Sequence, residues 1–239
     1  MIKKIINRVL GKKVLYEILK SNQELEWAHI YHDSIKGKPW LADLPLNVGR
    51  WAGNYSFLYV LNRILTDCRP KEILEFGLGE SSKIISKYIE NYLTESNHDI
   101  IEQDMEWLNH FNDRFKLSHK SSVQILPLVK KQVKGYETNS YENIENFISK
   151  KYDFYLIDGP FGSLHYSRYD IVNIAKDLNQ DDEFVILLDD YNRIGEKETF
   201  MDLLKILERN KIRVYTHIYE GTKSLSIIGT EKYKFISSL

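Results

Sequence analysis

The stretch KEILEFGLGESSK, residues 71–83, decides the fold of this chain. Its apolar residues between Ile73 and Phe76 predict a short buried strand, Gly77 and Gly79 predict a turn, and the serines that follow predict a helix start. A strand that ends in glycines and leads into a helix N-terminus brings bare backbone N–H groups close to a ligand. Because the same spacing occurs in ordinary turns, the stretch alone leaves a cofactor site and a plain turn both open.

The composition is that of an ordinary globular protein. The chain has 239 residues, of which 43% are hydrophobic and 28% charged, which suits one sizeable domain with an N-terminal extension or a small cap. A net charge of -1 gives no general electrostatic reason to bind nucleic acid, so we expect no such partner. The single cysteine, Cys68, excludes an internal disulfide and fits a reducing compartment. With neither a membrane span nor a secretory signal in the sequence, we predict a cytoplasmic location.

Residues 1–54 form the predicted N-terminal extension. Residues 1–20 contain six basic side chains and one acidic side chain, Glu17, and an apolar stripe runs along one side of the predicted helix. Such a helix contacts an anionic membrane surface peripherally, or it packs on its own domain or on a second subunit by self-association. Residues 21–54 predict irregular structure and short turns, in the manner of a lid. His29 and His32 are three residues apart but lack a third nearby ligand, so a metal site there is weakly supported.

From residue 55 onward, short apolar strands alternate with amphipathic helices. Strands are expected near residues 73–76, 98–104, 123–128, 152–157, 184–188, 213–219 and 225–228, whereas residues 130–145 fit neither pattern. Only five residues, 220–224, separate the last two strands, which is too short for a crossover helix and predicts an antiparallel hairpin. The fold class is therefore α/β: a doubly wound, mostly parallel sheet of seven strands with a C-terminal antiparallel hairpin.

Acidic residues mark the predicted ends of four strands. In such sheets, ligands bind at the carboxyl ends of the strands. Five acids at four strand ends exceed what turn chemistry places there by chance, although aspartate does favour turns. These acids are Glu75, Glu102, Asp158, Asp189 and Asp190.

The spacing of the first two acids favours one kind of cofactor. Glu102 follows Gly77 by 25 residues, where a carboxylate can accept both hydroxyls of a ribose. A dinucleotide fingerprint would carry a third glycine where Ser82 stands, and Glu75 would repel a pyrophosphate. A positively charged sulfonium cofactor would meet no such repulsion, so S-adenosylmethionine is favoured over a dinucleotide.

Four segments resemble the successive motifs of class I S-adenosylmethionine-dependent methyltransferases. They are LEFGLGESS, the strand IIEQD followed by EWLNHF, YDFYLIDGPFG with SRY just after it, and VILLDDYNR. The acid-plus-tryptophan pattern and the IDGP segment resemble the branch that includes glycan and small-molecule O-methyltransferases. The resemblance covers residues 71–229 and implies a Rossmann-like methyltransferase domain over residues 55–239, with residues 1–54 as a helical or irregular extension or lid.

The resemblance also implies a role for each residue of the cofactor site. Gly77 and Gly79 would let the backbone approach the methionine moiety, with Ser81 at the start of the following helix. Glu75 would orient the amino group directly or through water, and Glu102 would hold the ribose. The adenine pocket would come from a loop at residues 121–123, and a last cofactor contact, beside the methyl group, would come from Asp158.

Methyl transfer to oxygen requires the acceptor oxygen, the methyl carbon and the sulfur to lie in a line. A sugar or alcohol hydroxyl holds its proton tightly at neutral pH, so a base or a metal ion must help. The candidate bases are Asp158, His165, and Asp189 or Asp190. A metal-dependent branch binds Mg²⁺ through acids and an amide, for which the candidates here are Asp158, Asp190 and Asn192, although the spacing departs from that pattern.

The sequence leaves the acceptor open. Arg168 and Arg193 would bind an acidic group on a glycan or small-molecule acceptor, or they pair with the acids of the site itself. Aromatic residues between positions 27 and 55 would stack on a sugar ring or belong to the core. The leading hypothesis is methyl transfer to a hydroxyl of a sugar or other small acceptor. The alternatives are an NAD-dependent oxidoreductase acting on a sugar-type substrate and a non-catalytic scaffold with the methyltransferase fold.

Overall fold

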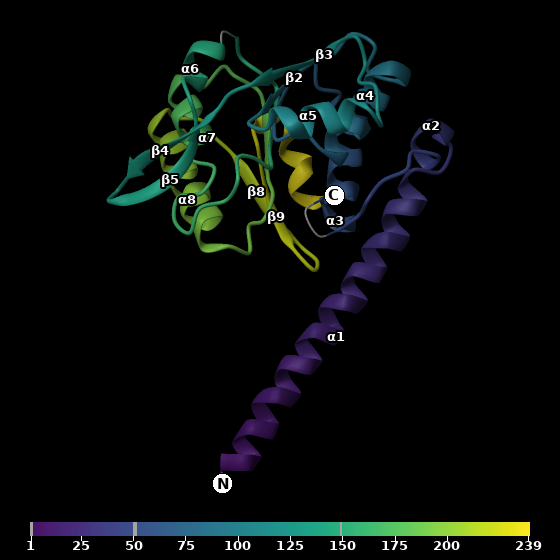
Figure 1. Ribbon diagram of the computed structural model, residues 1–239, viewed down its shortest axis with the longest axis vertical. Helices are drawn as coiled ribbons and strands as arrows, with labels where there is room; N and C mark the ends of the chain where they lie inside the picture. The colour runs from purple at the N-terminus through teal and green to yellow at the C-terminus, as the bar shows by residue number, and fades with distance from the viewer. Residues whose placement is uncertain (1, 50–51, 149) are drawn as a thin grey trace.

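The computed structural model describes residues 2–49, 52–148 and 150–239, the first nine of them by their backbone alone (Figure 1). The strands are β1 (Glu72–Phe76), β2 (Asn97–Glu102), β3 (Ser121–Ile125), β4 (Leu128–Val133), β5 (Tyr136–Tyr141), β6 (Phe154–Ile157), β7 (Val185–Leu188), β8 (Tyr215–Glu220) and β9 (Ser224–Gly229). The α-helices are α1 (Ile2–Ser34), α2 (Pro39–Ala42), α3 (Tyr55–Arg63), α4 (Glu80–Asn91), α5 (Met105–Asn112), α6 (Ile144–Phe147), α7 (Asp170–Ile174) and α8 (Ile194–Arg209). A π-helical turn follows α3 at Ile64–Cys68, and 3₁₀ segments lie at Ala175–Asp177 and Glu231–Ser238.

Seven strands form one sheet in the order β3-β2-β1-β6-β7-β9-β8. The first five are parallel, β9 runs antiparallel to β7, and β8 pairs antiparallel with β9. The chain winds outward from β1 in one direction and returns through β6 in the other, so the switch point of the topology lies between β1 and β6. The predicted fold class, including the C-terminal hairpin, is confirmed.

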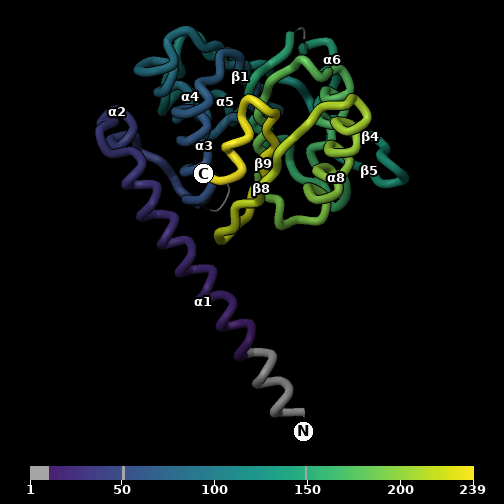
Figure 2. Tube along the Cα trace, turned by 180° about the vertical axis from the view of Figure 1, so that it is seen from behind, coloured from purple at the N-terminus to yellow at the C-terminus, as the bar shows by residue number. Residues whose placement is uncertain are grey.

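Helices cover both faces of this sheet, as Figures 1 and 2 show. On β1, Ile73 packs into the core under α3 and α4, whereas Leu74 packs into the core under α7 and α8. Neighbouring residues on a strand point to opposite faces, which is why the central strands are apolar throughout. Both cores leave the ends of the strands free for polar residues.

The unassigned region 130–145 contains a hairpin of its own. Strands β4 and β5 pair with each other as a separate two-stranded sheet. Its turn places Lys134 at φ 51° and Gly135 at φ 88°, both in the left-handed region that two-residue hairpin turns require. Most of the hairpin is exposed or half-buried, so no apolar face marks it in the sequence.

The N-terminal extension differs from its prediction. Helix α1 continues to Ser34, so irregular structure at residues 21–34 was a wrong prediction. The second half of α1 packs on α3, with Tyr31 and Ile35 buried in the core. Every residue from 11 to 19 is exposed, so packing of this part on its own domain was also wrong. The apolar stripe predicted at residues 2–10 lies outside the described side chains, and the boundary at residue 54 stays a prediction.

None of the helices in the described ranges is both long enough and apolar enough to cross a membrane.

Candidate active site

The predicted acids meet along one edge of the sheet. Phe76 pairs with Ile101 and with Ile157 in the parallel register, and Ile157 pairs with Leu188. The residues directly after these positions therefore lie next to one another at the carboxyl edge, on both sides of the switch point. They are Gly77, Glu102, Asp158 and Asp189.

The glycine turn is shaped by its contact with the neighbouring strand end. Gly77 has φ 94°, and a Cβ placed there would lie 3.3 Å from the carbonyl oxygen of Asp158. Its N–H donates to the carbonyl of Ile101 at 2.8 Å, so the turn closes over β2 as well. A Cβ on Gly79 would meet no described atom within 4 Å, which leaves open space above the first turn of α4. The close approach to Asp158 therefore requires a glycine at position 77, and the predicted roles of Gly77 and Gly79 toward the cofactor stay predictions.

Glu102 is held by backbone groups at the end of β2. Only 2% of the residue is exposed, and its carboxylate accepts hydrogen bonds from the N–H groups of Leu78 (2.9 Å), Gln103 (2.7 Å) and Asp104 (2.9 Å). Burial raises the pKa of Glu102 above its usual value, and these three N–H groups oppose that rise. Trp107 adds a bond from its indole N–H to the carbonyl of Leu78 at 2.7 Å. The glycine turn and the ribose candidate thus form one hydrogen-bonded unit.

Glu75 lies beneath this unit rather than at its surface. The residue is fully buried, its carboxylate accepts from the Ser81 hydroxyl, and it lies 2.8 Å from Nε2 of His98. The other ring nitrogen of His98 is 3.3 Å from Oγ of Ser121. Glu75 therefore ties β1 to α4 and β2, and its predicted role toward the cofactor's amino group stays a prediction.

The adenine loop expected at residues 121–123 is wrong. Ser121 begins β3 and pairs with His98 near the start of β2, so it lies at the amino edge, away from Glu102. The end of β3 does reach the site, because the N–H of Leu126 donates to the carbonyl of Glu102 at 2.9 Å. The sequence predicted this strand near residues 123–128, so its first two residues were assigned to a loop instead.

Three aspartates gather on the other side of the switch point. One carboxylate oxygen each from Asp158, Asp189 and Asp190 lies within 4.8 Å of the others. Asp189 is fully buried, and neither of its carboxylate oxygens meets a donor in good hydrogen-bonding geometry among the described residues. Asp190 stands at φ 58°, a left-handed backbone that turns the chain between β7 and α8. We call these three residues the acid cluster.

Basic side chains enclose the acid cluster. Arg168, 4% exposed, lies 3.0 Å from Asp158 and 2.9 Å from Asp190, and it also donates to the carbonyl of Asp189 at 3.1 Å. Arg193 reaches Asp190 at 2.9 Å, and Lys223 lies 3.5 Å from the same residue. The arginines predicted to bind the acceptor therefore pair with the acids of the site, the second of the two alternatives.

The protonation of the cluster follows from its burial. Burial, and after it the charge of Asp189, raises the pKa of Asp158 well above its usual value, although Arg168 opposes the rise. Burial, and after it the charge of Asp190, raises the pKa of Asp189 in the same direction. Perturbed carboxyl groups at the carboxyl edge of an α/β sheet are candidates for proton transfer.

Two predicted site residues have partners elsewhere. His165 lies 3.0 Å from Glu198 on α8, and its ring stacks on Tyr136 of β5 with centroids 4.0 Å apart. The side-chain oxygen of Asn192 accepts from the N–H of Ser224 at 3.2 Å. Both roles, as base and as metal ligand, stay predictions.

Two residues of this site escaped the sequence reasoning. Glu196 is fully buried near the start of α8, 3.8 Å from the guanidinium of Arg168. Lys223 comes from the turn between β8 and β9, far along the chain from the aspartates it approaches. An acid in the first turn of a helix and a lysine in a hairpin turn are common on surfaces, so neither carries a sequence signal.

A segment before α3 spans the two halves of the site. The N–H of Asn47 donates to Glu80 in the first turn of α4 at 3.1 Å, and the ammonium of Lys223 donates to the carbonyl of Ala52 at 3.1 Å. The segment thus joins the glycine turn to the side of the acid cluster.

The aromatic residues expected to stack on a sugar pack in the core instead. Trp27 packs on Tyr59 and Trp40 on Tyr88, while Trp51 lies outside the described residues.

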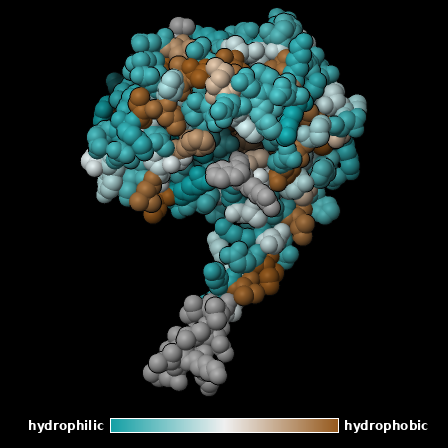
Figure 3. All heavy atoms as spheres, viewed as in Figure 1, coloured by the Kyte–Doolittle hydropathy of each residue, from teal (hydrophilic) through white to brown (hydrophobic). Residues whose placement is uncertain are grey.

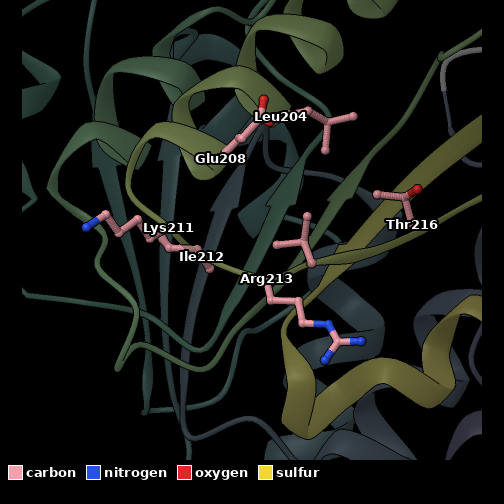
Figure 4. A pocket seen from close by; sticks show the side chains of 7 residues that line it. Leu204, Glu208, Lys211, Ile212, Arg213 and Thr216 are labelled. Atoms are coloured by element: carbon pink, nitrogen blue, oxygen red, sulfur yellow. The ribbon is translucent and has the colours of Figure 1, made fainter.

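A surface cavity of about 510 Å³ lies elsewhere (Figure 4). Its lining includes Leu204, Lys211 and Thr216, from the end of α8 and the start of β8. Tyr215 pairs with Gly229, which pairs with Val185 at the start of β7, so this cavity opens at the amino edge. It lies at the opposite end of the strands from the acids and plays no part in the site.

Solved structures share this fold. The O-methyltransferase TomG from Streptomyces achromogenes, involved in tomaymycin synthesis and crystallised with SAM, is 13% identical, with a TM-score of 0.54 over 86% of this chain and 89% of that one. An O-methyltransferase from Bacillus cereus in complex with SAH is 12% identical, with a TM-score of 0.45 over 85% of this chain and 91% of that one. No family model and no curated protein matches the sequence. The fold is that of the class I S-adenosylmethionine-dependent methyltransferases.

Proposed function

We propose that this protein transfers the methyl group of S-adenosylmethionine to a hydroxyl of a sugar or another small acceptor. The observation that carries the proposal is the arrangement at the carboxyl edge, where the glycine turn and Glu102 lie beside the acid cluster. This is where α/β sheets bind ligands. The fold shared with TomG, an O-methyltransferase crystallised with SAM, supports the same reading.

The residues around Glu102 fit the cofactor. S-adenosylmethionine supplies a methyl group made electrophilic by the positive charge on its sulfur. Glu102 would accept the ribose hydroxyls with lone pairs left over from its backbone bonds, and the space above Gly79 would admit the methionine part. The side-chain oxygen of Gln103, next in the chain, is buried and has no hydrogen-bond partner among the described residues, as expected of an acceptor that a ligand N–H satisfies.

The groups beneath the turn act on the cofactor from a distance. Ser81 donates to Glu75, so both side chains are committed under the first turn of α4. In this proposal they keep the turn in place, and the buried negative charge of Glu75 favours the positively charged ligand above it.

Asp158 is the proposed general base. A carboxylate with a raised pKa takes a proton from a hydroxyl more readily than an ordinary aspartate, provided that it is ionised when the acceptor binds. Arg168 keeps that ionised form available by its contact at 3.0 Å. Asp190 holds Arg168 from the other side, and His165 remains an alternative base through its pair with Glu198.

Arg168 also bears on the magnesium alternative. The oxygens of Asp158, Asp189 and Asp190 suit Mg²⁺ chemically, whereas the predicted third ligand, Asn192, is bonded to the backbone. Since the guanidinium of Arg168 already bridges two of the carboxylates, we propose that it supplies the positive charge of the site. Activity should then be unchanged by a chelator. Loss of activity that added Mg²⁺ restores would contradict this role.

Arg193 is the proposed acceptor contact. Its side chain is 45% exposed while it contacts Asp190, so in this proposal it would meet an acidic group on a glycan or small molecule. We propose a cytoplasmic setting, in keeping with the buried, unpaired thiol of Cys68.

Calorimetry with S-adenosylhomocysteine tests the cofactor half of the proposal. We expect saturable binding by the full chain, and competition by S-adenosylmethionine. Binding of NAD in its place would favour the oxidoreductase. Binding of the cofactor without methyl transfer to any acceptor in a panel of sugars, uronates and small alcohols would favour the non-catalytic scaffold.

A further inference from the structure

Residues 11–19 of α1 stand clear of the domain (Figures 1 and 3). We call residues 11–25 the outer helix segment. All residues from 11 to 19 are exposed, whereas the helix beyond residue 25 packs against α3. A helix that is not packed on a core normally has little stability of its own in water. Packing of its exposed surface against a partner would therefore stabilise this part of the helix.

Large apolar side chains dominate one side of this segment. They are exposed at 50–62% and follow one another at helical spacing, so that they share an arc of about 140° on an ideal helix. The polar arc opposite contains Lys13, Glu17 and Lys20. The apolar residues are Val14, Leu15, Ile18, Leu19 and Leu25.

Residues 1–20, which end inside this segment, are strongly basic. Within residues 1–20 the sequence has six lysines and arginines and a single acid, Glu17. Lys12 is exposed at the edge of the apolar arc, and Lys13 is exposed on the polar arc opposite. An apolar arc with basic side chains at its edge and on the opposite face fits a surface that is apolar below and anionic above, which is the chemistry of a bilayer with anionic headgroups.

The inner end of the segment is fastened to the domain. The carboxylate of Glu24 accepts from the N–H groups of Tyr55 (2.7 Å) and Thr222 (2.9 Å) and from the side chain of Asn54 (2.8 Å). The indole of Trp27 donates to the carbonyl of Glu220 at 2.7 Å. These bonds join α1 both to α3 and to the β8–β9 turn, so the helix leaves the domain in a defined direction.

We propose that the outer helix segment lies on the surface of an anionic lipid bilayer and holds the catalytic domain there. A second copy of the segment is the competing occupant, and the test below distinguishes the two. Spanning the bilayer is disfavoured by the charges at Lys12, Lys13 and Glu17, which recur too often along the helix.

Co-sedimentation of the full chain with vesicles tests the proposal. We expect binding to phosphatidylcholine vesicles that contain phosphatidylglycerol, and at least about tenfold weaker binding to phosphatidylcholine alone. The double variant Leu15→Glu/Leu19→Glu should weaken binding by at least about tenfold, since two buried leucines are lost. The charge reversal Lys12→Glu/Lys13→Glu should weaken binding to the anionic vesicles only. Met201→Glu, on an exposed apolar residue of α8, is the matched control and should bind as the parent does.

Three outcomes would overturn the proposal. The first is equal binding to both vesicle types, and the second is binding unchanged in both double variants. The third is a stable dimer in light scattering, present in the parent and absent in Leu15→Glu/Leu19→Glu, which would assign the segment to a second copy. Far-ultraviolet circular dichroism of each variant reports that its domain is folded, independently of the vesicles and of the proposed cofactor.

Discussion

Two buried carboxylates a few residues from the switch point are held in opposite ways. Glu102 receives three backbone N–H groups, and every one of them comes from its own turn or the neighbouring one. Asp189 is just as buried but has no donor in good geometry among the described residues, and its nearest cations belong to side chains from distant elements. Backbone geometry thus preorganises the proposed cofactor side, whereas long-range charge balance holds the proposed acceptor side.

This difference sets the kind of damage a substitution should cause. Removing a carboxylate that organises backbone groups disrupts local shape and ligand affinity. Removing a member of a charge-balanced cluster changes the pKa values and stability of the others. The four predictions below test this division, beginning with the largest expected effect.

Asp158→Asn should separate chemistry from cofactor binding. We expect kcat to fall by about 100- to 10,000-fold, because the proton acceptor is lost, while the Kd for S-adenosylhomocysteine is unchanged. Asp181→Asn, on an exposed loop, is the control. Weaker cofactor binding with normal turnover would indicate that Asp158 binds the cofactor and is not the proton acceptor.

Arg168→Leu should destabilise the fold by about 3–5 kcal/mol, because Asp158 and Asp190 would remain buried without their shared cation. Urea unfolding measures the loss, and Arg209→Leu, exposed on α8, is the control. If Arg168→Leu does not fold, Arg168→Lys keeps the charge and should lose less. A change within about 0.5 kcal/mol would mean that the cluster does not depend on this guanidinium.

Glu102→Ala should weaken S-adenosylhomocysteine binding by about 100-fold, or ~2.7 kcal/mol, since the ribose acceptor and the support of the turn disappear together. Glu102→Gln keeps one acceptor oxygen and should lose less. Calorimetry compares both with Glu106→Ala, an exposed acid in the next helix. An unaltered Kd in Glu102→Ala would remove Glu102 from the cofactor site.

Asp189→Asn should raise stability at neutral pH by about 1–2 kcal/mol. The pKa of Asp189 is higher in the folded state than in the unfolded chain, so its contribution is most favourable below the ordinary aspartate pKa and declines as pH rises through the raised value. The variant's stability should therefore fall less between acid and neutral pH. Urea unfolding at each pH measures this. If the free energy of unfolding changes equally with pH in the parent and the variant, the pKa of Asp189 is not the cause of the decline.

Local patterns were sufficient to predict the sheet and the edge at which the acids meet. Strand ends at Phe76, Ile157 and Leu188 followed from short apolar runs, and the acids after them needed only the rule that parallel strands end together. The β4–β5 hairpin was missed because both of its faces are largely polar, and the adenine loop was misplaced because β3 begins earlier than its apolar residues suggest.

The charge partners of the acid cluster were predicted only in part. Pairing of Arg168 and Arg193 with the acids was one of two alternatives left open, whereas Lys223, which reaches Asp190 across 33 residues, was missed because no periodicity links such positions. The extent of α1 was missed because tertiary bonds to Glu24 and Trp27 hold a polar stretch in helical form. Contacts of this kind exist only once the whole fold is assembled.

The turn between β8 and β9 connects two distant parts of the molecule at adjacent residues. Thr222 is bonded to Glu24 on α1, and the next residue, Lys223, places its ammonium 3.5 Å from Asp190. One peptide unit therefore links the long helix to the charge of the acid cluster. A movement of α1 that displaced this turn would move the Lys223 ammonium away from the aspartates. The position of the helix would then affect the pKa values of these carboxyl groups.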